Sequence, residues 1–174
     1  MAPIEPGNAR PFRKGEEAQL LSLMKGLAEF EGYIADFALS EHDIIECGLT
    51  YPPKFHAHVV PDQMSGELLG MAITYALNWT FSGKPHLVLK ELFVAEHARG
   101  LGVGDLLMTA VLNQANEIGA FRLQWTVLAN NERAKAFYRR FGANHDSQWE
   151  DWEIRLPTER VSDASPGVIQ RHVQ

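Results

Sequence analysis

Cysteine is nearly absent from this chain, since Cys47 is the only one among 174 residues. A single cysteine forms no internal disulfide and excludes a thiolate metal cluster, so we interpret Cys47 as structural. Long apolar runs are missing too, because charges interrupt every hydrophobic stretch before the roughly 18 residues of a membrane span. The opening Met-Ala-Pro-Ile-Glu-Pro has no signal-peptide character. We therefore expect a cytoplasmic protein without a membrane partner.

The chain also has no excess of basic over acidic residues. The chain has 16 Lys and Arg against 22 Asp and Glu, a formal net charge of −6. Nucleic-acid binding uses basic surface to displace counterions, so we predict no nucleic-acid partner. The acidic balance is compatible with a small cationic ligand.

Histidine offers no convincing metal site. His56 and His58 share one face of an expected strand, but two ligands without a third are more often structural. We predict no metal.

Length and composition fit one globular domain, with 45% hydrophobic and 22% charged residues. We expect this domain over residues 1–156 and a polar tail over residues 157–174. Strands are expected over Ala9–Arg13, Phe55–Pro61, Leu68–Leu77, Leu87–Ala95, Phe121–Leu128 and, once or twice more, within Asn144–Leu156. Helices are expected over Gly15–Phe30, from Ser40 to about Cys47, over Asp105–Ile118 and after Asn131, with Ser40 and Asp43 forming a capping box. The pattern predicts a mixed α/β fold.

The most informative motif is Arg99–Gly104, which reads Arg-Gly-Leu-Gly-Val-Gly between an expected strand and an expected helix. Glycines at alternate positions expose backbone N–H groups, and the helix N-terminus adds partial positive charge, which is typical of a diphosphate cradle. A Walker loop requires Gly-Lys-Ser/Thr, but Asp105 follows here. A dinucleotide fingerprint requires a small residue where Asp105 or Leu107 stands.

A second segment lies downstream, over residues 130–143. Asn131 is a good helix cap, and Gly142 suits a left-handed helix stop. Ala134, Phe137, Tyr138 and Phe141 recur at steps of three and four residues, which indicates a short amphipathic helix.

These two segments, in this order, resemble the acetyl-CoA site of the GCN5-related N-acetyltransferase (GNAT) family, and the resemblance covers roughly residues 9 to 156. It implies a single domain whose central, mostly antiparallel sheet is flanked by helices. It also implies acetyl-CoA as co-substrate and a homodimer. The implied contacts to acetyl-CoA are Phe93, Val94, Arg99, Gly100, Leu101, Gly102, Val103, Gly104, Asn131, Ala134, Phe137 and Tyr138.

Acetyl transfer to an amine requires a base, and a carboxylate suits this role. Strand alternation predicts that Glu91 shares a face with Leu87, Leu89 and Phe93, and these apolar neighbours would raise its pKa. The alternative is a strand-end carboxylate paired with Arg or Lys. A phenol, with a pKa of about 10 against about 8.5 for a thiol, can protonate a leaving thiolate. Tyr138 matches the position of the family's usual acid.

The segments Leu27–Glu31, Leu39–Gly48 and Glu150–Trp152 resemble the diamine subgroup, which acts on spermidine, spermine and thialysine. This resemblance implies that Glu31, Glu91, Glu150 and Asp151 surround a cationic acceptor and that Trp152 forms a wall. The subgroup has two adjacent acids where this chain has Lys90 and Glu91. Either Lys90 points away or the acceptor carries a carboxylate, which leaves a lysine-like or thialysine-like amino acid as open as a polyamine.

The resulting hypothesis is an acetyl-CoA-dependent N-acetyltransferase that acts on a small cationic primary amine by direct transfer. Two alternatives stay open at this point. One is a non-catalytic acyl-CoA-binding regulatory module. The other is an acetyltransferase whose acceptor is a protein or peptide.

Overall fold

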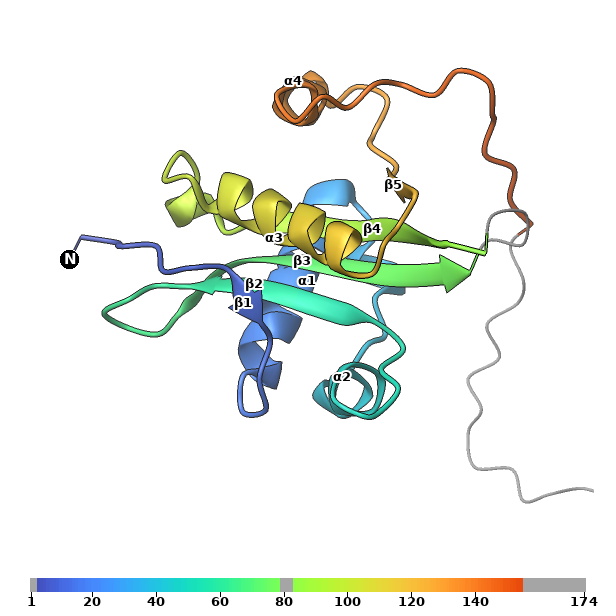
Figure 1. Ribbon diagram of the computed structural model, residues 1–174. Helices are drawn as coiled ribbons and strands as arrows, with labels where there is room; N and C mark the ends of the chain where they lie inside the picture. The colour runs from blue at the N-terminus through green and yellow to red at the C-terminus, as the bar shows by residue number, and fades with distance from the viewer. Residues whose placement is uncertain (1–2, 79–82, 155–174) are drawn as a thin grey trace, which may run out of the picture. The chain divides into compact units, whose positions relative to one another are not determined.

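The computed structural model describes residues 3–78 and 83–154 (Figure 1). The chain divides into two units, Met1–Leu128 and Ala129–Gln174. The first unit contains β1 (Arg10–Pro11), α1 (Glu17–Glu31), η1 (Ile34–Asp36), α2 (Glu41–Gly48), β2 (His56–Pro61), β3 (Leu68–Asn78), β4 (Pro85–Val94), η2 (Glu96–Ala98), α3 (Val103–Glu117) and β5 (Arg122–Gln124). The second contains α4 (Glu132–Arg139). The predicted tail from residue 157 lies outside the described residues.

The strands form one sheet in the order β1-β2-β3-β4-β5. The first four strands are antiparallel neighbours, and β5 is parallel to β4. This mixed, mostly antiparallel sheet confirms the predicted fold class. The long pair formed by β3 and β4, which runs from Gly70 opposite Val94 to Asn78 opposite Pro85, forms its centre.

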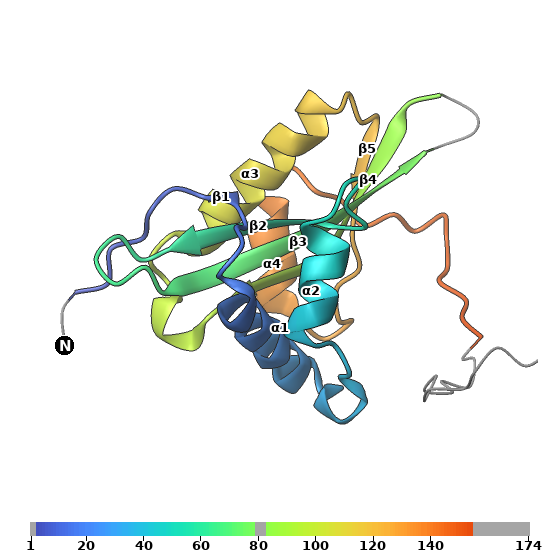
Figure 2. The ribbon, with the colours of Figure 1, turned by 90° about the horizontal axis from the view of Figure 1, so that it is seen from below.

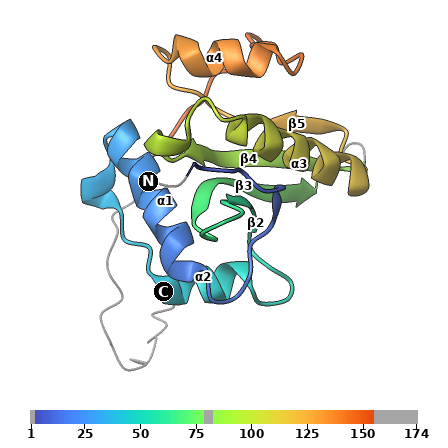
Figure 3. The same cartoon turned by 90° about the vertical axis from the view of Figure 1, so that its left-hand side faces the viewer.

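Helices cover both faces of the sheet in the first unit, with α1 and α2 on one face and α3 on the other (Figures 2 and 3). On the α1 face, Leu20, Met24 and Leu27 are buried in one cluster with Met71 and Ile73 of β3. Their spacing of three to four residues produces the apolar stripe of an amphipathic helix. This burial stabilises the packing of α1 on the sheet.

The α3 face is joined to the sheet by close packing and by one buried hydrogen bond. A Cβ at Gly70 would lie 2.9 Å from Cγ1 of Val103, so the backbone of β3 and the start of α3 are in tight contact. Further along, the Thr74 hydroxyl donates to Oε1 of Gln114 over 2.9 Å. The position of α3, and of the glycine loop before it, is thereby fixed against β3.

The helix cap predicted at Ser40 is present, and a left-handed glycine ends α1. The N–H of Asp43 donates to the Ser40 hydroxyl over 3.3 Å, and the N–H of Ser40 donates to the Asp43 carboxylate over 2.8 Å, which confirms the capping box. Helix α1 ends at Gly32, whose φ of 84° is left-handed. In the described part of the chain, no helix is both long and apolar enough to cross a bilayer.

Two strand predictions were wrong. The strand predicted over Phe121–Leu128 is limited to Arg122–Gln124, because β5 pairs with only His86, Leu87 and Val88 of β4. One or two strands were predicted within 144–156, but residues 144–154 contain no helix or strand and are exposed throughout, and residues 155 and 156 lie outside the described residues. Branched and aromatic residues favour a strand only where a partner strand accepts their hydrogen bonds.

Candidate active site

The central feature of the site is an irregularity in β4. Glu91 lies opposite Ile73 whereas Leu89 lies opposite the next residue, Thr74, so Lys90 is an extra residue that forms a β-bulge. Opposed residues point to the same face of a sheet, so Glu91 shares the α1 face with Ile73. Leu89 shares the α3 face with Thr74. The predicted alternation, with Glu91 on the face of Leu87 and Leu89, was therefore wrong, because a bulge reverses the order of faces.

The Glu91 carboxylate is partly buried, and its Oε2 is fully buried without a hydrogen-bond donor among the described residues. Burial raises the pKa of Glu91, the positive charge of Lys90 lowers it, and the negative charge of Glu31 raises it further. The net shift is upward. A carboxylate whose pKa lies above its ordinary value is a stronger base, as proton abstraction from an amine requires.

Five polar side chains of the first unit gather here, and we call them the Glu91 cluster. They are Glu31 at the end of α1, Tyr33 just after it, Tyr75 on β3, and Lys90 and Glu91 on β4. No side chain of the cluster makes a hydrogen bond or close ion pair with another described residue. The polar atoms of these five side chains are therefore not taken up by other described residues.

Electrostatic coupling shows that the cluster members influence one another. Burial raises the pKa of Tyr33 to about 12, and the charges of Glu91 and Glu31 add to this rise. Burial and the charge of Glu91 raise the pKa of Tyr75. Burial raises the pKa of Glu31 while Lys90 lowers it. At neutral pH both phenols thus keep their protons and remain hydrogen-bond donors.

The glycine loop has the conformation that its sequence predicts. Gly100 and Gly102 have φ values of 83° and 80°, and Gly102 is the N-cap of α3. A Cβ at either position would meet no atom within 4 Å, so the loop surface is open. The first N–H groups of α3 have no acceptor within the helix. They form its N-terminal end, which carries a partial positive charge. This geometry fits a diphosphate group.

Arg99 connects the loop to α1. Its Nε donates to the Val94 carbonyl over 3.3 Å, and its guanidinium lies 5.8 Å from the ring centre of Phe30 and 6.0 Å from that of Phe93. The Val103 side chain is buried under the sheet, so only its backbone can contact a ligand. Leu101 is exposed.

In the second unit, the predicted cap is confirmed, since Asn131 Oδ1 accepts the N–H of Ala134 over 3.0 Å. The amide nitrogen of Asn131 donates to no described residue and is available to a ligand. The rings of Phe137 and Tyr138 meet edge to face, with their centres 5.2 Å apart. Gly142 has a φ of 79°, as a left-handed stop requires.

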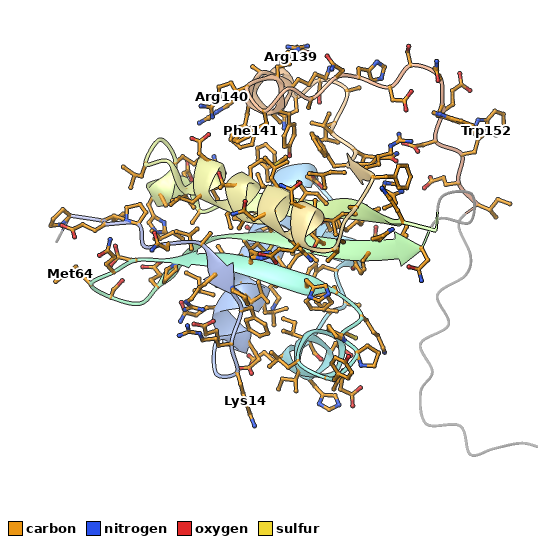
Figure 4. The ribbon with its side chains drawn as sticks, viewed as in Figure 1. Lys14, Met64, Arg139, Arg140, Phe141 and Trp152 are labelled. Atoms are coloured by element: carbon orange, nitrogen blue, oxygen red, sulfur yellow. The ribbon has the colours of Figure 1, made fainter. Side chains whose placement is uncertain are left out.

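The structure does not place Glu150, Asp151 and Trp152 on a strand. All three are exposed, and Trp152 has 89% of its surface accessible. Figure 4 shows Trp152 on the extended segment after α4, well apart from Arg139 and Arg140 on that helix. Their predicted contact with an acceptor therefore has no support from the fold of the second unit.

A match to a known family model identifies the protein family of this chain. The family model described as "Acetyltransferase (GNAT) family" matches residues 20–143. This chain belongs to the GNAT family. The match includes the Glu91 cluster, the glycine loop and α4, and members of this N-acetyltransferase family use acetyl-CoA as co-substrate.

Two curated relatives of this GNAT protein have named acceptors. The chain is 27% identical over 149 residues to thialysine N-epsilon-acetyltransferase of Bos taurus, which covers 82% of this chain and 87% of the bovine protein. It is 31% identical over 91 residues to L-ornithine N5-acetyltransferase of Arabidopsis thaliana, which covers 52% of this chain and 40% of the plant protein.

Solved structures confirm the fold. A probable acetyltransferase superposes with a TM-score of 0.74 at 22% identity, covering 88% of this chain and 100% of the other. An aminoglycoside acetyltransferase from an uncultured soil metagenomic sample, in complex with sisomicin, has a TM-score of 0.72 at 16% identity over 87% of this chain and 97% of the other.

Sequence reasoning missed Tyr33 and Tyr75, because neither belongs to a motif. One signal could have pointed to Tyr33. It directly follows Gly32, the glycine that caps α1 after Glu31, so it lies close to that carboxylate in the chain. Tyr75 carries no signal of its own. Its role depends on the register that brings β3 beside Glu91.

Proposed function

We propose that this GNAT enzyme transfers the acetyl group of acetyl-CoA to the primary amine of a small cationic acceptor by direct transfer. The observation that carries the proposal is the Glu91 carboxylate, with its raised pKa and its buried oxygen that lacks a donor. An isolated buried carboxylate opposes folding, and such groups are concentrated at functional sites. Glu31, Tyr33 and Tyr75 surround it with groups that recognise an ammonium or an amine.

Glu91 is the proposed base, which accepts a proton from the acceptor amine directly or through water. Tyr138 is the proposed acid, which returns a proton to the departing thiolate. Acetyl-CoA supplies the acetyl group as an activated thioester. The N–H groups of Gly100–Gly104 and the guanidinium of Arg99 would hold its diphosphate, while the Val94 backbone, Phe93, Asn131, Ala134 and Phe137 are the remaining proposed contacts.

The relatives support an amine acceptor of this size. The bovine and plant proteins are named for the acetylation of thialysine and L-ornithine. Both acceptors are amino acids with a side-chain amine, and both are cationic at neutral pH. Contacts of the acceptor with Glu150, Asp151 and Trp152, a homodimer and a cytoplasmic location all stay predictions.

The test is release of free thiol from acetyl-CoA with spermidine, putrescine, L-lysine, thialysine, short peptides and an aminoglycoside as acceptors. We expect turnover on a small amine. Glu91→Gln should lower kcat/KM by about 10² to 10⁴, and Tyr138→Phe should lower kcat. Glu29→Gln, an exposed carboxylate on α1, is the matched control.

Acetyl-CoA binding without turnover on any acceptor would contradict the proposal and favour a binding module. Turnover on peptides alone would favour a protein acetyltransferase. Full activity of Glu91→Gln would remove Glu91 from the reaction.

A further inference from the structure

Lys90 occupies an unusual place for a cation in a site that takes cationic acceptors. It is the extra residue of the β-bulge, directly before Glu91, and it is exposed. Within the part of the chain that the structure describes, its ammonium makes no hydrogen bond and no close ion pair. Its charge nevertheless acts on both carboxyl groups of the cluster, Glu31 and Glu91. Lys90 therefore belongs to the cluster and has a free ammonium.

The charges of the cluster form a recognisable set. Glu31 and Glu91 provide two carboxylates, and Lys90 provides one ammonium. A diamino acid such as L-lysine or L-ornithine carries the complementary set, with two ammonium groups and one carboxylate. A polyamine carries only ammonium groups, so Glu31 and Glu91 would attract it but Lys90 would have no carboxylate to bind. Repulsion between like charges disfavours binding of the wrong partner, so Lys90 would weaken polyamine binding relative to that of a diamino acid.

We propose that Lys90 is a specificity-determining residue that binds the carboxylate of the acceptor, so that the enzyme selects diamino acids over diamines and polyamines. This inference rests on the proposed function, since it names the acceptor class of the same site. Glu31 and Glu91 then receive the two amines. Lys90 stands at the bulge directly before Glu91, so it is the cation next along the strand to the proposed base.

The experiment uses acceptors that differ only in the carboxylate. Cadaverine is L-lysine without its carboxylate, and putrescine is L-ornithine without its carboxylate. We would measure kcat/KM for both pairs with saturating acetyl-CoA, in the full chain and in Lys90→Met, Lys90→Arg and Lys90→Glu. Lys14→Met is the matched control, because Lys14 points outward from the turn between β1 and α1 (Figure 4).

The wild-type enzyme should prefer each amino acid to its diamine. Lys90→Met should lower this ratio about 10- to 100-fold, as expected for the loss of one charge-assisted hydrogen bond. Lys90→Arg should largely keep the ratio, and Lys90→Glu should reverse it. Lys14→Met should leave it unchanged.

Equal use of cadaverine and L-lysine by the wild-type enzyme, or an equal ratio in Lys90→Met, would overturn the role of Lys90 while the proposed acetyltransferase activity stands. Absence of thiol release with all four acceptors, and with the wider panel of amines, would overturn both proposals. The two failures are thus distinguished by a single set of assays.

Discussion

The ring of Phe93 lies directly against the backbone of Gly26. A Cβ at Gly26 would come within 2.9 Å of Cε1 and Cζ of that ring. Phe93 stands two residues after Glu91 on β4, and the Arg99 guanidinium lies over its ring. The end of β4, the glycine loop and the middle of α1 therefore meet at one side chain.

Gly26→Ala should consequently destabilise the protein. Alanine in a helix interior is ordinarily favoured over glycine by about 1 kcal/mol, but overpacking against a confined ring costs about 1 to 3 kcal/mol. We expect a net loss near 1 kcal/mol in the free energy of unfolding and a lower kcat/KM, since Phe93 must move. Urea denaturation measures the first quantity. Lys25→Ala, at the exposed neighbouring position, is the control, and a Gly26→Ala variant more stable than wild type would contradict the tight contact.

Glu91→Gln should stabilise the protein at neutral pH even as it removes activity. The pKa of Glu91 is raised in the folded state, chiefly by burial, so the folded protein binds this proton more tightly than the unfolded chain. Ionisation then opposes folding above the unfolded-state pKa, and this cost is complete above the folded-state pKa. Glutamine carries no charge and escapes this cost.

The gain in Tm from Glu91→Gln should be largest near pH 8. It should shrink as the pH falls through the raised pKa, and disappear below the unfolded-state value of about 4.3. Thermal melts of both proteins across this range measure it, with Glu29→Gln reporting the effect of losing one surface charge. A gain that does not depend on pH would show that Glu91 ionises freely.

Most helices and strands, and the glycine loop, could be predicted from the sequence, because helix caps and glycine turns depend on residues close together in the chain. The Ser40 cap, the Asn131 cap and the left-handed glycine at 142 all occur where the sequence indicates them. Each depends on hydrogen bonds or backbone angles that neighbouring residues determine.

Features that depend on pairing between distant segments could not be predicted in this way. The bulge at Lys90 exists only in the register of β4 against β3, and nothing in the sequence around Lys90 indicates it. The same limit explains the strands wrongly predicted over residues 144–154. Trp149, Trp152 and Ile154 are of residue types that favour strands, but no described strand pairs with them. The place of Tyr75 beside Glu91 follows from register as well, and that of Tyr33 from the packing of α1 on the sheet.

Asn131 has two roles that substitution can separate. Its Oδ1 caps α4, while its amide nitrogen is available to acetyl-CoA. Asn131→Ala should lose the cap at a cost of about 1 kcal/mol and also weaken acetyl-CoA binding. Asn131→Ser keeps a capping oxygen but has no amide, so it should raise KM for acetyl-CoA with little change in stability. If Asn131→Ser binds acetyl-CoA as wild type does, the amide makes no contact.

Substitution of Gly102 tests the diphosphate cradle, and Gly66, which has a similar positive φ, is the control position. Gly102 and Gly66 have φ values of 80° and 74°, and a Cβ would meet no atom within 4 Å at either. Alanine at each position should therefore cost a similar 1 to 2 kcal/mol, roughly, through backbone strain alone. Only Gly102→Ala alters the N–H groups that begin α3.

We therefore expect Gly102→Ala to weaken acetyl-CoA binding about tenfold or more, equivalent to about 1.4 kcal/mol, whereas Gly66→Ala, in the turn between β2 and β3, should bind it as wild type does. Calorimetric titration with acetyl-CoA and urea denaturation of both variants supply the comparison. Equal loss of affinity in the two would mean that binding follows overall stability rather than the loop. Loss in Gly102→Ala alone would assign the diphosphate to the start of α3, because the strain is matched and only the position differs.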